Sequence, residues 1–233
     1  MTSTAAIIGS TGLVGSHILS TILNVDAFKS VYTISRRQPK GESPKLTAIV
    51  EADTTKWTSS LSSIAPPPSI VISALGTTRA QAGGIANQWK IDHDLNVELA
   101  KSAHAAGAKT FMFISSAGIR GPGSSYLPYS QMKVGVENSI KELNFDQAII
   151  LQPGLLLGER ETPKAANTIF GALVRGLGKI SQGVQDKLGQ EADVIARAAV
   201  RAAMMAAEGK APDKYWVIGA AEIIKLGREE WKS

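Results

Sequence analysis

Apolar runs rich in β-branched residues recur along the chain and are bounded by turn-forming residues. Helix-like segments lie between most of these runs, beginning with residues 13–23. Runs of this kind predict strands, and their alternation with helices is the βαβ pattern. The six predicted strands are Ala5–Ile8, Val31–Ile34, Leu46–Val50, Ile70–Ile72, Thr110–Ile114 and Ala148–Leu151.

The predicted strands are almost continuously apolar. This pattern is typical of a parallel sheet that is covered by helices on both faces, with right-handed crossovers between its strands. The sequence therefore predicts an α/β fold with a doubly wound parallel sheet, the Rossmann fold.

The chain becomes mostly helical after Gly154. We expect helices over residues 165–177 and 191–207, a short strand over residues 215–218, and a last helix toward Trp231. Hydrophobic residues make up 44% of the 233 positions, which supports one sizeable core. We therefore predict a single domain over residues 1–233, in which residues 155–233 contribute a small, mostly helical C-terminal cap.

A glycine-rich loop follows the first predicted strand and leads into a helix. It reads Gly9-Ser10-Thr11-Gly12-Leu13-Val14-Gly15, a G-x-x-G-x-x-G variant of the dinucleotide fingerprint. The first glycine permits the turn, the second allows a pyrophosphate to approach, and the third lets the helix pack closely. Backbone N–H groups near Leu13 and Val14, with the hydroxyls of Ser10 and Thr11, would bind the anion. The alternative is a merely tight strand-to-helix turn.

The end of the second strand indicates which nucleotide is bound. Arg36 and Arg37 stand where a basic residue would pair with a 2′-phosphate, so we predict NADP(H) rather than NAD(H). Two arginines at this position can also be plain solvent-facing charge. Asp53, at the end of the third strand, would accept a hydrogen bond from the adenine amino group, or act as a helix N-cap.

The fourth strand ends in small residues. Ala74, Leu75 and Gly76 would let the middle of the cofactor pass over the edge of the sheet.

Tyr129 and Lys133 are four residues apart, so on a helix both project from one face. An ammonium beside a tyrosine favours the phenolate and brings the tyrosine pKa toward the working range, which suits acid catalysis. Ser116 ends the fifth strand, where its hydroxyl can orient a substrate carbonyl. The serine can instead simply end the strand.

Several classes of function are excluded or left unsupported by composition. The chain has no cysteine, which removes disulfides, thiolate metal sites and a cysteine nucleophile. Its three histidines lack neighbours at ligand spacing, so no metal is predicted. The formal charge of +5 suits an anionic ligand, but no spacing of tryptophans with basic residues supports nucleic-acid binding. No apolar run is long enough to span a bilayer, and we expect no cleavable leader.

These motifs resemble the atypical short-chain dehydrogenase/reductases. Within that superfamily, the segments at 114–118, 129–133 and 152–157 are similar to the Tat-interactive protein oxidoreductase family, and residues 7–15 are similar to its fungal mitochondrial outer-membrane branch. The resemblance covers nearly the whole chain.

The resemblance implies an NADPH-binding protein in which Tyr129 is the proton donor, Lys133 holds the nicotinamide ribose and Ser116 orients the substrate. It further implies that Asn96 joins a proton relay, that Pro153 borders the cofactor, and that the protein is peripheral to the mitochondrial outer membrane. One departure is Gln152, where many relatives carry arginine. An anionic substrate group at that edge is therefore in doubt.

Two functions from different classes follow. The first is an NADP(H)-dependent reductase of a small carbonyl substrate, and the second is a non-catalytic NADPH-binding regulator or adaptor, because a fold alone does not prove catalysis. The substrate, the direction of the reaction and the oligomeric state are left open by the sequence.

Overall fold

A seven-stranded parallel sheet forms the centre of the computed structural model, which describes residues 3–157 and 189–231. Its strand order is β3-β2-β1-β4-β5-β6-β9, and every pair in it is parallel. The strands are β1 (Ser3–Ile8), β2 (Phe28–Ser35), β3 (Leu46–Val50), β4 (Ile70–Ser73), β5 (Thr110–Ile114), β6 (Gln147–Gln152) and β9 (Tyr215–Gly219). This order confirms the predicted doubly wound fold.

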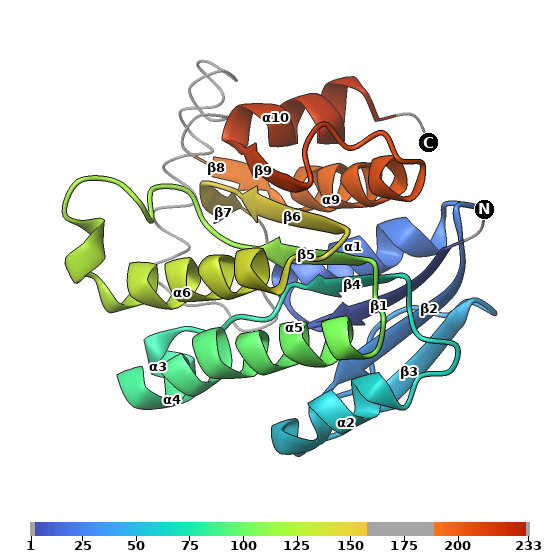
Figure 1. The fold of residues 1–233 in the computed structure, drawn as a ribbon, viewed down its shortest axis with the longest axis horizontal. Helices are drawn as coiled ribbons and strands as arrows, with labels where there is room; N and C mark the ends of the chain where they lie inside the picture. Colours follow the sequence, from blue (N-terminus) through green and yellow to red (C-terminus); the bar gives the residue numbers. More distant parts are fainter. Residues whose placement is uncertain (1–2, 158–188, 232–233) are drawn as a thin grey trace.

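Helices cover both faces of the sheet (Figure 1). Helices α2, α5 and α6 lie on one face, and α1 and α9 lie on the other. The helices are α1 (Leu13–Leu23), α2 (Trp57–Ser62), α3 (Arg79–Ala82), α4 (Ile85–Trp89), α5 (Leu95–Ala105), α6 (Pro128–Leu143), α9 (Ala192–Ala207) and α10 (Ala220–Ile224). Two 3₁₀ turns, η1 (Thr54–Lys56) and η3 (Ser124–Tyr126), and two π-helical turns, η2 (Lys90–Asp94) and η4 (Lys225–Glu229), complete these elements.

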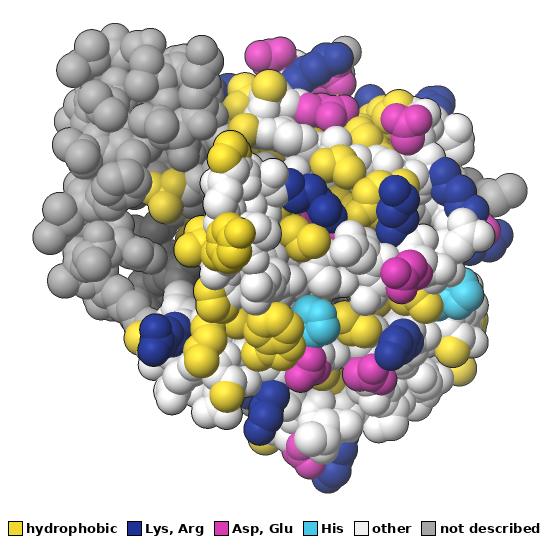
Figure 2. All heavy atoms as spheres, turned by 60° about the vertical axis from the view of Figure 1, so that its left-hand side comes forward, with side chains coloured by type: hydrophobic (Ala, Val, Ile, Leu, Met, Phe, Trp, Pro, Cys, Tyr) yellow, Lys and Arg dark blue, Asp and Glu magenta, His cyan; other side chains and the backbone are white. Residues whose placement is uncertain are grey.

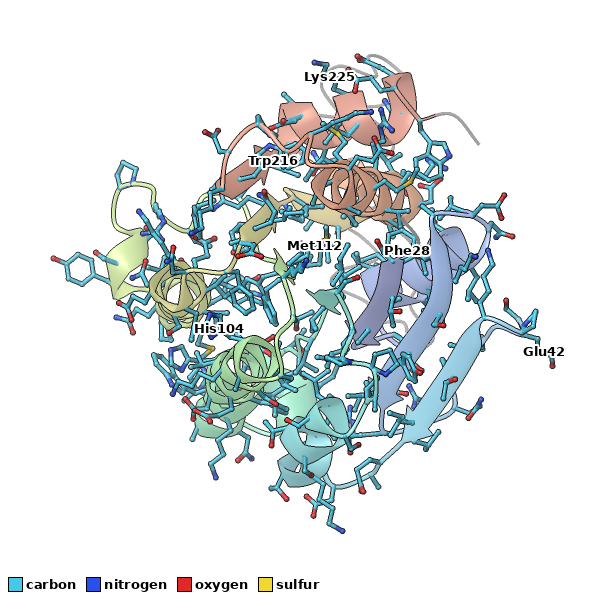
Figure 3. The ribbon with its side chains drawn as sticks, turned by 45° about the vertical axis from the view of Figure 1, so that its right-hand side comes forward. Phe28, Glu42, His104, Met112, Trp216 and Lys225 are labelled. Atoms are coloured by element: carbon cyan, nitrogen blue, oxygen red, sulfur yellow. The ribbon has the colours of Figure 1, made fainter. Side chains whose placement is uncertain are left out.

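Alternate residues of each strand enter two different cores. In β1, Ala5 and Ile7 pack into the core under α1 and α9, whereas Ala6 and Ile8 pack into the core under α5 and α6. Figure 3 shows Met112 and Trp216 within the first core and His104 on helix α5 at the other face. Because both faces are buried, both sets of positions must be apolar, which explains the continuous runs.

The described part of the C-terminal region is built into the sheet. Strand β9 pairs with β6 in register from Ala148↔Tyr215 to Gln152↔Gly219, and α9 packs against the same core as α1. The expected strand at 215–218 is therefore the edge strand of the main sheet. A small second sheet pairs β7 (Leu155–Leu157) with β8 (Gly189–Glu191), and the helix expected at 165–177 lies outside the described residues.

The order of the strands reverses between β1 and β4. From β1 the chain proceeds outward to β2 and β3, and it then crosses back to β4 on the other side. In open α/β sheets this switch point opens a crevice at the carboxyl ends of the strands, where ligands bind. The carboxyl ends of the strands point to the left in Figure 1.

Candidate functional site

The glycine loop lies directly against the end of β4. Gly9 has φ +83°, and a Cβ there would be 2.8 Å from the carbonyl carbon of Ala74 and 2.9 Å from the nitrogen of Leu75. Ala74 N also donates to Ile8 O at 2.9 Å, which ties the two strand ends together. Ala74 and Leu75 thus form the wall beside the loop, and only glycine permits both the backbone angle and this approach.

The helix that follows the loop packs closely and leaves its N-terminus uncapped by a side chain. A Cβ on Gly15 would lie 2.1 Å from Gly9 O, so the third glycine is required by backbone contact. The N-cap is Gly12, with no side-chain hydrogen bond, and the first turn of α1 has no acidic residue. An uncapped helix N-terminus with positive dipole favours an anion.

Ser10 supplies a second indication at the same loop. Its side chain is fully buried, and its Oγ has no hydrogen-bond partner among the described residues. Buried hydroxyls are normally partnered, and orphaned ones need an explanation. The glycine cradle, the uncapped helix and this hydroxyl fit the pyrophosphate of a dinucleotide. Thr11, Leu13 and Val14 stand at the same turn, where Thr11 is half-buried and Val14 packs into the core.

The predicted 2′-phosphate site lies at the neighbouring strand end. Arg36 and Arg37 are both exposed just after β2, and the hydroxyl of Ser35 donates to Arg37 O at 2.7 Å, which shapes the turn. Asp53 is the N-cap of η1: it accepts from Thr55 N at 3.0 Å and from the Thr55 hydroxyl at 2.6 Å, contacts that lower its pKa. The N-cap alternative for Asp53 is thus present in the structure, and a contact with adenine stays a prediction.

Tyr129 and Lys133 lie on the first two turns of α6, which begins with Pro128 at its first position. Proline at this position is favourable because its missing N–H needs no partner there. Tyr129 is 42% exposed, whereas Lys133 is only 5% exposed. The helix therefore leaves Tyr129 partly exposed and buries the lysine.

The Lys133 ammonium is buried at the end of β5. Its Nζ donates to Ile114 O at 3.0 Å and lies 4.5 Å from the centre of the Phe113 ring. Burial lowers the pKa of Lys133 to about 8, although the carboxylates of Asp92 and Glu137 oppose this shift. A buried lysine with a pKa near neutrality is typical of functional sites.

A cavity of about 380 Å³ opens beside this corner. It is lined by Ser115, Ser116, Ala117, Tyr129, Pro153, Gly154, Leu155 and Leu156. The structure therefore brings the predicted residues Ser116, Tyr129 and Pro153 around one space, within the size range of small-molecule sites. Its described lining is apolar apart from the serine and tyrosine hydroxyls and backbone groups.

Asn96 lies elsewhere, buried at the start of α5. Its Oδ1 accepts from the Ser73 hydroxyl at 2.6 Å, and its Nδ2 donates to Ile91 O at 3.1 Å and Asp92 O at 3.2 Å. Asn96 thus joins the end of β4 to the π-helical turn η2. Its expected part in a proton relay stays a prediction.

Two buried carboxylates at this site escaped the sequence analysis. Glu137, one turn after Lys133, accepts from the Ser115 hydroxyl at 2.6 Å and from Gln152 Nε2 at 2.8 Å, while Arg120 donates to its other oxygen at 3.0 Å. Asp92, on η2, is 1% exposed. The only available signal was the spacing of Glu137, four residues after Lys133.

The described residues contain neither a helix that is long and apolar enough to cross a membrane nor a group of three acidic or histidine side chains placed to hold a metal.

Comparison with known proteins identifies the family of the chain. Residues 5–219 match the model of the NAD dependent epimerase/dehydratase family. The chain belongs to this family. "Protein fmp52-2, mitochondrial" of Aspergillus oryzae is 61% identical over 99% of both chains, and "Protein fmp-52, mitochondrial" of Neurospora crassa is 62% identical over 99% of this chain and 97% of its own.

Several solved structures share the fold at low sequence identity. MoeE5, solved in complex with UDP-glucuronic acid and NAD, has a TM-score of 0.67 at 16% identity and covers 93% of this chain and 76% of its own. A UDP-N-acetylglucosamine 4-epimerase of Methanobrevibacter ruminantium M1 has a TM-score of 0.67 at 16% identity. These likenesses confirm the Rossmann-like fold of the chain.

Proposed function

We propose that this protein is an NADP(H)-dependent reductase of a small carbonyl compound. The observation that carries the proposal is the meeting of Tyr129 and Ser116 at one cavity, with Lys133 buried one turn away on the same helix. The fold is that of an oxidoreductase-like, NAD(P)-binding family, and the glycine loop suits a dinucleotide. An acid and an orienting hydroxyl at one cavity, with a buried cation one turn away on the same helix, suit carbonyl reduction.

The proposed chemistry divides among three side chains. When bound, the nicotinamide cofactor supplies the hydride. The Ser116 hydroxyl donates a hydrogen bond to the substrate carbonyl oxygen and orients it, and the Tyr129 hydroxyl gives that oxygen its proton. The Lys133 ammonium would hold the ribose of the bound cofactor through a hydrogen bond. This arrangement requires protonated Lys133, so activity should fall as the pH rises through about 8.

The preference for NADP(H) is part of the same proposal. It is supported by two exposed arginines, Arg36 and Arg37, immediately after β2, next to the strand that leads into the glycine loop. A guanidinium binds a phosphate group through paired hydrogen bonds.

We further propose that the protein is peripheral to the mitochondrial outer membrane, takes a small-molecule carbonyl substrate and binds no nucleic acid. Support for the organelle comes from the names of its Aspergillus and Neurospora relatives, which read mitochondrial.

The proposal is tested with Tyr129→Phe and a panel of aldehydes and ketones, followed by NADPH absorbance. We expect kcat to fall at least about 100-fold, the usual contribution of a general acid, and the NADPH dissociation constant to change less than about twofold. Tyr126→Phe is the matched control, because Tyr126 is 86% exposed three residues earlier. Undiminished turnover in Tyr129→Phe would contradict the catalytic role, and tight NADPH binding without turnover by the natural chain would favour the adaptor function.

A further inference from the structure

Asp92 is a buried carboxylate whose own partners are neutral. Its Oδ1 accepts from Thr77 N at 2.7 Å and its Oδ2 accepts from Gln88 Nε2 at 3.1 Å. Burial raises the pKa of Asp92, while the nearby Lys133 charge and these two hydrogen bonds lower it. A buried charge is costly unless another charge compensates it.

Asp92 lies on the π-helical turn η2, and its side chain is buried there. Such turns are rare and occur mostly at functional sites. Asn96 holds this one in place, because its Nδ2 donates to the carbonyl groups of Ile91 and Asp92 while its Oδ1 is fixed by Ser73 on β4. Asn96 therefore links the turn to β4 through hydrogen bonds to Asp92 O and to the Ser73 hydroxyl.

Asp92 and Lys133 meet across Gly76. A Cβ built on Gly76 would lie 4.0 Å from Asp92 Oδ1 and 4.0 Å from Lys133 Nζ. This spacing places the carboxylate and the ammonium around the same small space, in a low-dielectric interior where charges interact strongly. The glycine leaves that space open.

The other carboxylate near Lys133 is already compensated. The charged groups that act on Lys133 are Asp92 on η2 and Glu137 on α6 itself. Glu137 already forms a salt bridge of 3.0 Å with Arg120, so another cation partly offsets its charge. Asp92 forms no salt bridge within the described parts of the chain. It is thus the carboxylate left to balance the ammonium.

We infer that Asp92 is the positioning residue that keeps Lys133 protonated in its buried site. The inference rests on the proposed function and deepens it, because a protonated Lys133 is what the ribose contact requires. Asp92 acts through Lys133. Asn96 in turn acts through the π-helical turn that carries Asp92. Of the measurements below, only the cofactor-binding one assumes the proposed function.

The direct test titrates Lys133 in the protein without added cofactor. Lysine labelled with ¹³C at Cε is followed by NMR from pH 6.5 to 10, and the Lys133 signal is assigned by its loss in Lys133→Arg. We expect Asp92→Asn to lower the midpoint by roughly one pH unit, the usual effect of removing an opposite charge nearby. Asp94→Asn, at an exposed position two residues later, should leave the midpoint unchanged. An equal midpoint in Asp92→Asn and the natural chain would overturn the inference.

A second measurement uses stability and needs no resolved NMR signal from Lys133. Urea midpoints are compared for the natural chain, Asp92→Asn, Lys133→Met and the double variant. We expect Lys133→Met to lower the midpoint less in the Asp92→Asn background, because the ammonium there is already without its counter-charge. Additive shifts would overturn the inference.

The cofactor readout separates this inference from the proposed function. At pH 8 we expect Asp92→Asn to weaken NADPH binding about threefold to tenfold through the lost ammonium, since one unit in pKa is a tenfold change in protonation ratio. A lowered Lys133 midpoint with unchanged NADPH affinity would keep the role of Asp92 and contradict the ribose contact of Lys133.

Discussion

The glycine loop and the corner between β5 and α6 face the same edge of the sheet but are built from different groups. In the loop, the tight contacts are between backbone atoms: Gly9 against Ala74, and Gly15 against Gly9 O. At the corner, the contacts are between polar side chains around Glu137 and Lys133. The loop depends on positions that carry no side chain, and the corner depends on the charges of its side chains.

Substitutions in the two regions therefore have different consequences. A side chain added at a glycine of the loop would clash with backbone atoms, and the clash could be relieved only by shifting α1 away from the sheet. A side chain changed at the corner leaves the backbone in place and alters charge balance and hydrogen bonding. Figure 2 turns forward the left-hand side of Figure 1, and on this surface hydrophobic side chains gather with basic ones scattered among them.

The largest effect is expected from Gly15→Ala in the loop. The added Cβ would meet Gly9 O at 2.1 Å, so the loop and α1 must separate. We expect the free energy of unfolding to fall by about 3 kcal/mol, as for severe overpacking, and NADPH affinity to fall at least about 100-fold. Urea denaturation and fluorescence titration with NADPH measure the two quantities.

Gly227→Ala is the matched control for that variant. Its Cβ would lie 2.1 Å from Val194 O, an equally severe contact between η4 and α9 that involves no residue of the loop. We expect a similar loss of stability with unchanged NADPH affinity of the folded protein. If both variants lose NADPH affinity equally, the loop has no special part in cofactor binding.

A smaller effect, confined to the corner, is expected from Glu137→Gln. The change removes a buried charge that accepts from Ser115, Gln152 and Arg120. We expect a loss of about 2 kcal/mol in unfolding free energy, discounted because the Arg120 side chain is half-exposed. NADPH affinity should change less than about threefold, since the loop is untouched and Arg120 already offsets part of the Glu137 charge near Lys133.

Glu142→Gln, an exposed position on the same helix, is the control and should alter neither quantity. A fall in NADPH affinity as large as that of Gly15→Ala would show that the two regions act as one. If Glu137→Gln is as stable as the natural chain, the buried hydrogen bonds of Glu137 do not contribute to stability.

The two regions also differ in how far the sequence predicts them. The glycine spacing predicts the loop and α1 (Leu13–Leu23) because local backbone contacts need glycines at fixed positions. Apolar runs likewise predict the strands, because both faces of the sheet are buried. The edge strand β9 is predicted as a strand, but its pairing with β6 depends on contacts far apart in sequence.

The corner is predicted only in part. Tyr129 and Lys133 stand out by their spacing, whereas Glu137 and Asp92 look like ordinary surface acids of a helix. Their burial depends on partners such as Ser115, 22 residues before Glu137, and on the π-helical turn that turns Asp92 inward. Neither the turn nor the burial has a local signature, so side-chain networks of this kind need the folded structure.

The smallest effect is expected from Arg36→Glu, which tests a side-chain contact with the cofactor next to the backbone contacts of the loop. Arg36 is exposed and its contact with a 2′-phosphate would involve a side chain, unlike the backbone contacts of the loop. We expect NADPH affinity to fall about tenfold, or about 1.4 kcal/mol, with NADH affinity within about twofold of the natural chain. Lys29→Glu makes the same charge change near the opposite end of β2 and should alter neither affinity. Equal losses for NADPH and NADH in Arg36→Glu would contradict the NADP(H) preference, because a contact with the 2′-phosphate affects only the cofactor that carries it.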